Sequence, residues 1–400
     1  MIIGRKQKME RKLRILVVHN RYQIPGGEDT VVQNEIAMLK KYGHEVFYYE
    51  RNNSEMKEYS VLQKLTLPFN SIYSAKTKKE VKALIKEHRI DIVHVHNTFL
   101  VTSPSVYDAA EECGVPVVQT VHNFRFVCPN ALFFRDGTVC EDCLTGGLGC
   151  AVKHSCYRGS KAQTAIVALT LKRMRTANVF DRIYCICLTP FNKQKLLEGG
   201  IIKEDHIFLK PNFVAKQKAP LPFSDRKAQV VWAGRLEEIK GIRFLLEAWK
   251  ERKDDLRLIV CGDGPLQEEC ERYVSQNRLS SVELRGRIPH EEVLSLLRES
   301  RGMVFTSEVY EGFPMTIAES FACGTPVLAA DFGNGGALVQ EGVNGFHYEP
   351  HSVSSFHEAL DRLLEKDDYD LDAMVKQYDE ETNCQILCHI YEEVLQRKKN

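Results

Sequence analysis

The apolar residues of this chain form short unbroken runs that alternate with longer segments of helical periodicity. The first run, at 14–19, is followed by a glycine-containing turn and by an amphipathic pattern over 30–42, which Gly43 ends, as a glycine just past a helix commonly does. A second run, at 229–233, is followed by Gly234 and by another helical pattern. Both halves of the chain are therefore predicted to begin with a strand, a turn and a helix.

Further apolar runs continue each half of the chain. We expect them as strands at 45–49, 91–96, 116–122 and 182–188, and then at 257–261, 282–285, 302–306 and 326–329. Runs without polar alternation are typical of parallel strands that helices cover on both faces. The alternation of strands with helices predicts the α/β class, with two doubly wound parallel sheets in two domains.

A stretch rich in lysine and proline separates the two predicted sheets. It extends from about 210 to 223 and lacks periodicity, which is typical of a linker. We therefore expect a first domain over 1–212, a second over 213–375, and a helical segment over 376–400 that packs back on the first domain. Doubly wound sheets bind ligands at the carboxyl ends of their strands, so functional residues are expected in the loops that follow the strands.

Composition and charge narrow the class of protein. The 400 residues are 44% hydrophobic and 27% charged, as in soluble globular proteins of two or three domains. The 54 basic and 54 acidic residues cancel, which argues against a dedicated nucleic-acid binder. The N-terminus lacks the apolar core of a signal peptide, and no apolar run approaches the ~20 residues that span a bilayer. We expect a cytoplasmic protein whose 13 cysteines stay reduced.

Two carboxylates frame a loop and a helix start in the second half. Glu311 and Glu319 are separated by seven residues, and Pro314 lies between them at a place that suits the first turn of a helix. Backbone amides at such a helix start bind anions. The carboxylates fit this site if they accept hydrogen bonds from sugar hydroxyls. An acidic surface loop before a capped helix is the alternative.

Cations and glycines follow the first strand of each half. Arg235 and Lys240 come directly after the 229–233 strand, where two cations can converge on one diphosphate; solvated surface charges are the alternative. Gly26 and Gly27 follow the first strand and would let the backbone approach a phosphate closely. They do not form the G-x-G-x-x-G fingerprint, which disfavours a dinucleotide-binding oxidoreductase.

A cysteine-rich segment over 125–160 stands apart from the other thiols. Cys128, Cys140, Cys143 and Cys156 give the spacing C-x11-C-x2-C-x12-C, which can close a tetrahedral structural zinc site. A redox or disulfide role and unligated thiols are the alternatives.

Basic residues flank an apolar segment at 165–171. They are Lys153, His154, Arg158, Lys161, Lys172, Arg173 and Arg175. Such a pattern can hold a protein peripherally on an anionic membrane surface. A solvated helix face is the alternative.

The order of these motifs resembles family 4 of the retaining glycosyltransferases, of the kind that builds bacterial surface polysaccharides. The resemblance rests on the Gly26-Gly27 turn, His122 after a strand, Gly234-Arg235 with Lys240, Gly262-Asp-Gly-Pro265, Gly286-Arg287, the pair Glu311 and Glu319, and Ala322-Cys-Gly-Thr-Pro-Val327. It implies the GT-B fold, in which two Rossmann-like domains face each other across a cleft and the second holds most of a nucleotide-sugar. It also implies transfer of that sugar to a saccharide acceptor, lipid-linked, without a catalytic cofactor.

The resemblance assigns roles to particular residues. Arg235 and Lys240 match the pair that grips the donor diphosphate, and Glu319 the carboxylate on the ribose. Glu311 and His122 match residues that meet the donor sugar from the second and first domains. Retention of configuration is implied, with a diphosphate oxygen taking the acceptor's proton.

The remaining donor contacts come from backbone groups. Gly26 and Gly27 resemble a loop that closes over the phosphates, and Arg287 with Ile288 resembles the part that meets the base. The last three backbone contacts to the donor are expected from the turn between the two carboxylates, at Gly312, Phe313 and Met315. Pro314 departs from the family, which usually has a glycine there, so one amide donor is missing.

Two other activities share this fold or this chemistry. The fold also serves sugar-nucleotide epimerases and phosphorylases, but no segment marks the lysine that a phosphorylase needs for pyridoxal phosphate. A non-catalytic carbohydrate-binding protein would be expected to lose Arg235, Lys240 or Glu311, and all three are present.

Overall fold

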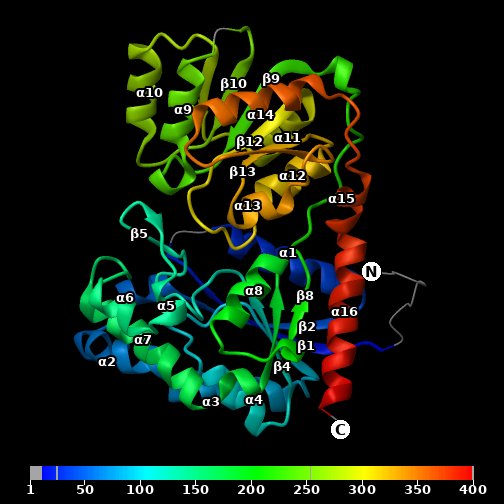
Figure 1. Cartoon of the computed structure of the whole chain (residues 1–400). Coiled ribbons are helices and arrows are strands. Elements are labelled where there is room, and N and C mark those ends of the chain that lie inside the picture. The colour runs from blue at the N-terminus through cyan, green and yellow to red at the C-terminus, as the bar shows by residue number, and fades with distance from the viewer. Residues whose placement is uncertain (1–10, 24–25, 253, 399–400) are drawn as a thin grey trace. The chain divides into compact units, whose positions relative to one another are not determined.

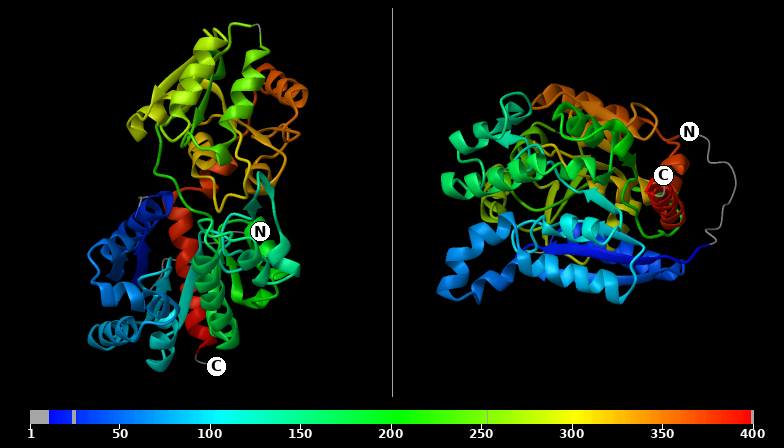
Figure 2. Two further views of the ribbon diagram at one scale, coloured as in Figure 1. Left: turned by 90° about the vertical axis from the view of Figure 1, so that its left-hand side faces the viewer. Right: turned by 90° about the horizontal axis from the view of Figure 1, so that it is seen from below.

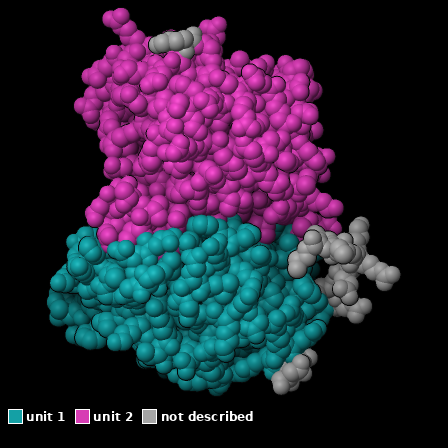
Figure 3. Space-filling view, viewed as in Figure 1, with its two compact units in different colours: residues 1–131, 141–210, 383–400 teal, residues 132–140, 211–382 magenta. Residues whose placement is uncertain are grey.

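The computed structural model describes residues 11–23, 26–252 and 254–398. It divides into two compact units, coloured separately in Figure 3. The first comprises residues 1–131, 141–210 and 383–400, and the second 132–140 and 211–382.

The first unit is built on a six-stranded sheet with the order β2-β1-β3-β4-β7-β8. Every neighbouring pair runs parallel, as the uninterrupted apolar runs predict. The strands are β1 (Arg14–Arg21), β2 (Glu45–Asn52), β3 (Ile92–Val95), β4 (Val117–Val121), β7 (Ile183–Cys187) and β8 (Ile207–Leu209).

Helices connect these strands and flank the sheet (Figures 1 and 2). Several begin at a serine or threonine whose side-chain oxygen accepts a backbone N–H of the first turn, as at Ser60, Ser74, Ser160 and Thr189. The α-helices are α1 (Gly27–Lys41), α2 (Val61–Ile72), α3 (Ala75–Glu87), α4 (Ser105–Glu112), α5 (Asp142–Thr145), α6 (Gly149–Lys153), α7 (Lys161–Thr176), α8 (Pro190–Glu198) and α16 (Glu380–Arg397). The 3-10 turns are η1 (Asn53–Lys57), η2 (Val179–Asp181) and η3 (Glu204–His206).

The last segment of the chain contains two helices where the sequence predicts one over 376–400. A short helix, α15 (Asp372–Gln377), ends in the second unit, and α16 begins three residues later. The break occurs because the carboxylate of Asp379 accepts the backbone N–H of Thr382 at 2.6 Å, which caps the new helix. From Asn383 onward α16 belongs to the first unit (Figures 1 and 2). Leu387, Tyr391 and Val394 form its fully buried face.

The second unit contains another six-stranded parallel sheet, with the order β11-β10-β9-β12-β13-β14. The strands are β9 (Lys227–Ala233), β10 (Arg257–Cys261), β11 (Val282–Gly286), β12 (Ser300–Phe305), β13 (Val327–Ala330) and β14 (Gly345–Tyr348). The helices are α9 (Ile242–Lys250), α10 (Gln267–Gln276), α11 (His290–Glu299), α12 (Met315–Ala322), α13 (Gly333–Leu338), α14 (Val353–Glu365) and α15, with 3-10 turns η4 (Phe223–Asp225) and η5 (Glu238–Lys240).

Successive residues of the central strand β9 enter two different cores. Val230 and Trp232 pack on one face with α9 and α14, while Val231 packs on the other face with α11 and α12. Successive side chains of a strand point to opposite faces, so both faces of this sheet are buried. The two parallel sheets with flanking helices confirm the predicted α/β class and its doubly wound architecture.

The cysteine-rich segment is divided between the units, although the sequence predicts it as an insertion of the first domain. A small antiparallel hairpin of β5 (Phe134–Arg135) and β6 (Thr138–Val139) groups with the second unit. Phe133, which precedes it, is fully buried and its ring lies 5.9 Å from that of Tyr310. This aromatic contact accounts for the grouping, because it ties the base of the hairpin to the loop after β12.

Helix α7 holds the apolar segment that the sequence places beside a membrane. Its apolar residues Val167, Leu171 and Met174 are buried in the first unit, and Arg175 donates to the carbonyl of Phe126 at 3.0 Å. That apolar face is therefore core, and the expectation of a lipid-facing α7 is wrong for this reason. The exposed apolar helix of the first unit is its neighbour α2, with Phe69 and three other large residues in solvent.

Candidate functional site

The sheet order of the second unit brings the loops that carry the predicted cations and Glu311 to one edge of the sheet. Strands β9 and β12 are neighbours at its centre, and the chain leaves them toward opposite edges. Doubly wound sheets bind ligands at such a switch point, beyond the carboxyl ends of the strands. Arg235 and Lys240 follow β9, and Glu311 follows β12.

Lys240 and Glu311 are in direct contact. The ammonium Nζ of Lys240 lies 2.5 Å from Oε1 of Glu311, and the hydroxyl of Ser307 donates to the same oxygen at 2.7 Å. Their side chains are 28% and 18% exposed, so water reaches both. The pair offers a cation for a phosphate oxygen and, beside it, a carboxylate that can accept a hydrogen bond from a hydroxyl group. Ser307 is a member of the site that the sequence analysis missed, although it directly follows the 302–306 strand.

A close backbone approach holds the two loops together. At Gly241 the backbone has φ +67°, and a Cβ atom would lie 1.9 Å from the carbonyl oxygen of Thr306. The Thr306 hydroxyl donates to the carbonyl of Lys240 at 2.7 Å and accepts the indole N–H of Trp232 at 2.9 Å. Only glycine fits this position, because any side chain would collide with a backbone atom. The approach sets where Lys240 enters the site.

Backbone hydrogen bonds also join the loops after β9, β10 and β11. The amide of Gly234 donates to Cys261 at 3.0 Å, and that of Gly262 to Gly286 at 2.8 Å. Arg235 is half exposed and pairs with Glu237 at 2.6 Å. Its charge therefore lies at the same loop cluster as Lys240, but it is paired to its own loop.

The two residues that are expected to contact the base of the nucleotide differ in exposure. Arg287 is exposed, in the loop after β11. Ile288 packs against the core of the unit.

The turn before α12 is held by side chains from two other segments. Nδ2 of Asn334 donates to the carbonyl of Gly312 at 3.1 Å, and the ring of Phe313 lies 5.8 Å from that of Tyr378. Pro314 is the cap residue and Met315 begins the helix. Backbone amides at a helix start are the groups that bind anions.

Glu319, on α12, has a different partner from Glu311. Its Oε1 lies 3.0 Å from Nε2 of His290, and this hydrogen bond raises the pKa of His290 above its usual value. Only 12% of the Glu319 side chain is exposed. His290 is a second residue that the sequence analysis missed; it begins α11, two residues after Ile288.

The predicted residues of the first unit lie around the ends of β1 and β4. His122 follows β4 directly, and its Nε2 is 2.9 Å from Nδ1 of His96. Gly26 caps α1 with φ −130°, and its amide donates to the carboxylate of Asp29 at 2.9 Å. A Cβ atom at Gly26 or Gly27 would meet nothing within 4 Å. Packing within the described residues therefore does not require glycine at these two positions.

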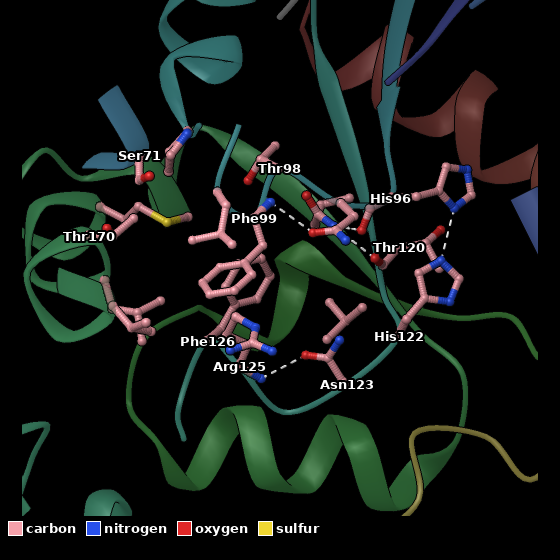
Figure 4. A pocket seen from close by; sticks show the side chains of 18 of the residues that line it. Ser71, His96, Thr98, Phe99, Thr120, His122, Asn123, Arg125, Phe126 and Thr170 are labelled. Atoms are coloured by element: carbon pink, nitrogen blue, oxygen red, sulfur yellow. Dashed lines mark hydrogen bonds between the residues drawn. The ribbon is translucent and has the colours of Figure 1, made fainter. Parts of the chain in front are cut away.

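A pocket in the first unit opens beside His122 (Figure 4). Its volume is about 650 Å³ when the space open to solvent is counted. Apolar side chains of α7 form one side, and His96, His122 and Arg125 lie on others. The guanidinium of Arg125 lies 3.9 Å from the ring centre of Phe99, a cation–π contact.

The cysteines of the segment form no disulfide within the described part of the chain. Burial, followed by the nearby Cys128, Cys150 and Cys156, raises the pKa of Cys143 to about 12. These four thiols share one neighbourhood in the first unit, whereas Cys140 belongs to the second unit. Among the described residues, the one group of three or more side chains with closely spaced metal-ligand atoms consists of Glu35, His94 and His96. The zinc site stays a prediction.

Comparison with known protein families places both halves of the chain in one class. The model for "Glycosyl transferases group 1" matches residues 213–382, and the model for "Glycosyltransferase Family 4" matches residues 25–217. An uncharacterized glycosyltransferase, MJ1178 of Methanocaldococcus jannaschii, is 33% identical over 369 residues, which covers 89% of this chain and 90% of that protein.

Solved structures share the fold over almost the whole chain. The apo form of the lipopolysaccharide outer core galactosyltransferase WaaB superposes with a TM-score of 0.67 at 18% identity, over 95% of this chain and 100% of that one. The Anabaena protein Alr3699/HepE in complex with UDP and glucose does so with a TM-score of 0.58 at 17% identity, over 96% and 98%. At such identities the likeness shows the fold alone, which is GT-B.

The close approach at Gly241 generates a prediction about stability. We expect Gly241→Ala to lower the free energy of unfolding of the second unit by more than about 3 kcal/mol, because the backbone of two loops must separate. Gly342→Ala is the matched control, since Gly342 also has positive φ (+71°) but meets nothing within 4 Å. It should cost only about 1–2 kcal/mol of left-handed strain. Denaturant unfolding measures both, and equal losses would contradict the argument.

Proposed function

Because this protein belongs to glycosyltransferase family 4, we propose that it transfers a hexosyl unit from a nucleotide-sugar to a saccharide acceptor with retention of anomeric configuration. The observation that carries the proposal is the contact of Lys240 with Glu311, whose carboxylate also accepts a hydrogen bond from Ser307, at the switch point of the second sheet. A lysine poised for a phosphate next to a carboxylate poised for a hydroxyl suits the two parts of such a donor.

The donor contacts follow from the chemistry of each side chain. Lys240 and Arg235 bind the diphosphate, with the amides of Gly312, Phe313 and Met315 near the start of α12 as further donors. That HepE was solved with UDP and glucose supports a nucleoside diphosphate sugar as the donor class.

The remaining contacts concern the sugars and the base. Glu311 accepts from a hydroxyl of the transferred sugar and Glu319 from the ribose, while Arg287 and Ile288 meet the base. In the first unit, Gly26 and Gly27 approach the phosphates and His122 meets the transferred sugar.

The transfer itself needs charge neutralisation more than a strong base. As the bond from the anomeric carbon to the diphosphate oxygen breaks, Lys240 and Arg235 stabilise the negative charge that develops. The acceptor hydroxyl forms the new bond from the same face, and its proton passes to an oxygen of the departing diphosphate. The leaving group thus acts as the base, and the anomeric configuration is kept.

The acceptor is proposed to be a lipid-linked saccharide of polysaccharide biosynthesis. The name of WaaB, a lipopolysaccharide outer core galactosyltransferase with this fold, supports an acceptor of this class. A panel of UDP-, GDP- and ADP-sugars tests the function, because the cognate donor raises the melting temperature of the protein. NMR of the product formed from that donor and a saccharide acceptor then reports its anomeric configuration. An inverted product would contradict the proposal.

Removing the diphosphate cations should slow the reaction. We expect Lys240→Ala or Arg235→Ala to reduce kcat/KM by about 30- to 900-fold, the equivalent of about 2–4 kcal/mol of transition-state stabilisation. Lys227→Ala is the control, because Lys227 is exposed and pairs with Glu299 at the amino end of β9, away from the carboxyl ends of the strands. Steady-state kinetics with the cognate donor measure all three. Wild-type kcat/KM in either of the first two variants would remove that residue from the mechanism.

The surface of α2 supports work at a membrane. Val61, Leu62, Leu65 and Phe69 are 77%, 72%, 67% and 73% exposed, and at helical spacing they share one face. Lys64 is the sole charged residue of this helix. No helix of the described residues is long and apolar enough to cross a membrane. We propose that α2 lies on an anionic bilayer with its apolar face in the headgroup region.

Basic residues near α2 support the choice of an anionic lipid surface. Arg173 lies 4.2 Å from the ring centre of Tyr73, the residue that ends α2, and Lys78 lies 5.9 Å from the same ring. Basic groups beside an apolar helix strengthen binding to anionic lipid. None of the 13 cysteines forms a disulfide among the described residues, and we propose that the protein binds the cytoplasmic side of that membrane.

Vesicle flotation tests this proposal. We expect the wild-type protein to float with vesicles that contain anionic lipid, and Leu65→Gln/Phe69→Gln to stay at the bottom, because the change removes two large apolar side chains from the buried face. Leu209→Gln is the control, since Leu209 is an exposed apolar residue of the same unit. Equal recovery of the double variant and the wild type would contradict a role for α2.

We also propose a structural zinc in the cysteine-rich segment. The fit rests on soft thiolate donors that share one neighbourhood, Cys128, Cys143 and Cys156, with Cys140 or Cys150 as the fourth. Zinc stabilises a fold by tying such ligands together.

Elemental analysis of the purified protein should find one zinc per chain. We expect Cys143→Ser to lose the zinc and to lower the melting temperature, because a three-ligand site binds more weakly. Cys113→Ser is the control, at a free thiol outside the segment. Comparing Cys140→Ser with Cys150→Ser identifies the fourth ligand. Less than about a tenth of an equivalent in the wild type would end the proposal.

A further inference from the structure

The core of the first unit contains a row of three stacked histidines. His94 and His96 lie on and just after β3, and His122 follows β4. The ring centres of His94 and His96 are 4.3 Å apart, and those of His96 and His122 are 5.2 Å apart. His94 and His96 are buried. Of these three histidines, only His122 has a role in the proposed transfer.

A buried ion pair stands at the inner end of this row. Oε2 of Glu35, on α1, lies 3.0 Å from Nζ of Lys210, and the two side chains are 2% and 1% exposed. Although burial alone would raise the pKa of Glu35, the positive charge of Lys210 holds it well below its usual range. Glu35 is therefore a carboxylate, which can only accept hydrogen bonds.

The other oxygen of Glu35 faces the histidines. Its Oε1 lies 3.3 Å from Nε2 of His96, and Nδ1 of His96 lies 2.9 Å from Nε2 of His122, as Figure 4 shows for the second contact. Within the described protein, Nε2 of His96 has no other partner, whereas Oε1 of Glu35 also lies 3.2 Å from Nδ1 of His94. The three groups form one line from the ion pair to His122.

The hydrogen-bond donors and acceptors along this line determine the tautomer of each ring. A carboxylate accepts, so Nε2 of His96 carries the hydrogen that faces it, and Nδ1 of neutral His96 is then an acceptor. Nε2 of His122 must therefore carry the hydrogen between the two rings. Burial lowers the pKa of His122 well below its usual value, which keeps the ring neutral. Its Nδ1 is left with a lone pair and, among the described residues, without a protein donor.

We propose that the Glu35–Lys210 ion pair acts through His96 to hold His122 as the Nε2–H tautomer, with Nδ1 presented as an acceptor for a hydroxyl of the transferred sugar. Glu35 and His96 are positioning residues in this arrangement. The inference rests on the role given to His122 under the proposed function. A ring nitrogen with a fixed partner keeps its tautomer and its orientation before substrate arrives.

His94 contacts the same oxygen of Glu35, with its Nδ1 at 3.2 Å, but it lies outside the line that runs from Glu35 through His96 to His122. Its Nδ1 is 2.6 Å from the hydroxyl of Tyr391 on α16, and its Nε2 is 2.8 Å from Oγ1 of Thr120. No hydrogen bond joins it to His122 among the described contacts. It is as deeply buried as His96 and shares the contact with Glu35 but not the contact with His122, so it offers a matched control for the His96–His122 contact.

A metal ion is the competing interpretation of these groups. Ligand atoms of Glu35, His94 and His96 lie within 4.8 Å of one another. The ammonium of Lys210 on the same carboxylate argues against a divalent cation, because like charges repel strongly in a buried site. Metal content is accordingly one outcome of the test.

The first measurement is NMR of the full chain with 15N-labelled histidine. His122→Asn assigns the ring, and two-bond 1H–15N correlations identify the tautomer. We expect wild-type His122 to be neutral with its hydrogen on Nε2 at pH 7. His96→Asn should give a mixture of tautomers at His122, because the asparagine is too short to reach it, whereas His94→Asn should leave His122 unchanged. If His96→Asn does not fold, Glu35→Gln takes its place, since an amide can accept from or donate to His96 and removes its bias.

The second measurement is the pH profile of kcat with the cognate donor. We expect His96→Asn to lower kcat by about tenfold to a hundredfold, as loss of a second partner does for an oriented histidine, with little change in the donor KM. The acid limb should also move toward neutral pH, because His122 protonates more easily. The titratable groups that face His122 are His19 from β1, Glu35, His94 and His96, and His94→Asn reports the effect of a change among them that leaves the line intact.

The outcomes distinguish the positioning line from the proposed role of His122 in transfer. An unchanged His122 tautomer in His96→Asn, or the same change in His94→Asn, would overturn the positioning line. So would one equivalent of a divalent metal that Glu35→Gln removes. A tautomer shift without loss of kcat would instead overturn the role of His122 in transfer and leave the positioning line standing.

Discussion

The ammonium of Lys240 reaches Glu311 because the backbone at Gly241 passes the carbonyl of Thr306 more closely than any side chain would permit. Two loops that leave adjacent strands toward opposite sides of the sheet would otherwise diverge. The Thr306 hydroxyl, bonded to Lys240 and Trp232, holds them at contact distance. The proposed donor site depends on this backbone approach, since it brings together a cation and a carboxylate separated by 71 positions in the chain.

In the first unit, distant segments of the chain are held together by a buried ion pair. Glu35 and Lys210 come from the first helix and the end of the last strand, and their pairing is satisfied in the core. A buried ion pair of this kind adds little net stability, but losing one partner is costly. Its value here is orientation, because the remaining carboxylate oxygen faces a row of histidines that ends at His122. Helix α16 joins the same core through Tyr391.

Particular residues show how far the site could be predicted. Lys240 and Glu311 could be placed at strand ends, because a loop after a buried parallel strand always opens at the same edge of the sheet. The pairing of Arg235 with Glu237 could not be predicted, because a long flexible side chain can reach either its own loop or the neighbouring loops at the strand ends. His290 and Ser307 were missed because single polar residues in loops have no periodic pattern. The exposed face of α2 could have been found, because Val61, Leu62, Leu65 and Phe69 already share a helical face in the sequence.

The sequence by itself determined two α/β sheets and the order along the chain of five strands in each, because the period of apolar residues is local and distinguishes buried strands from helices. It did not predict the short edge strands β8 and β14. It also determined that the chain resembles one glycosyltransferase family. Only the tertiary structure decided which apolar helix faces the core, that the hairpin after Phe133 groups with the second unit, and that His96 and Glu35 stand behind His122. These features depend on contacts between residues far apart in the chain, and such contacts leave no local pattern.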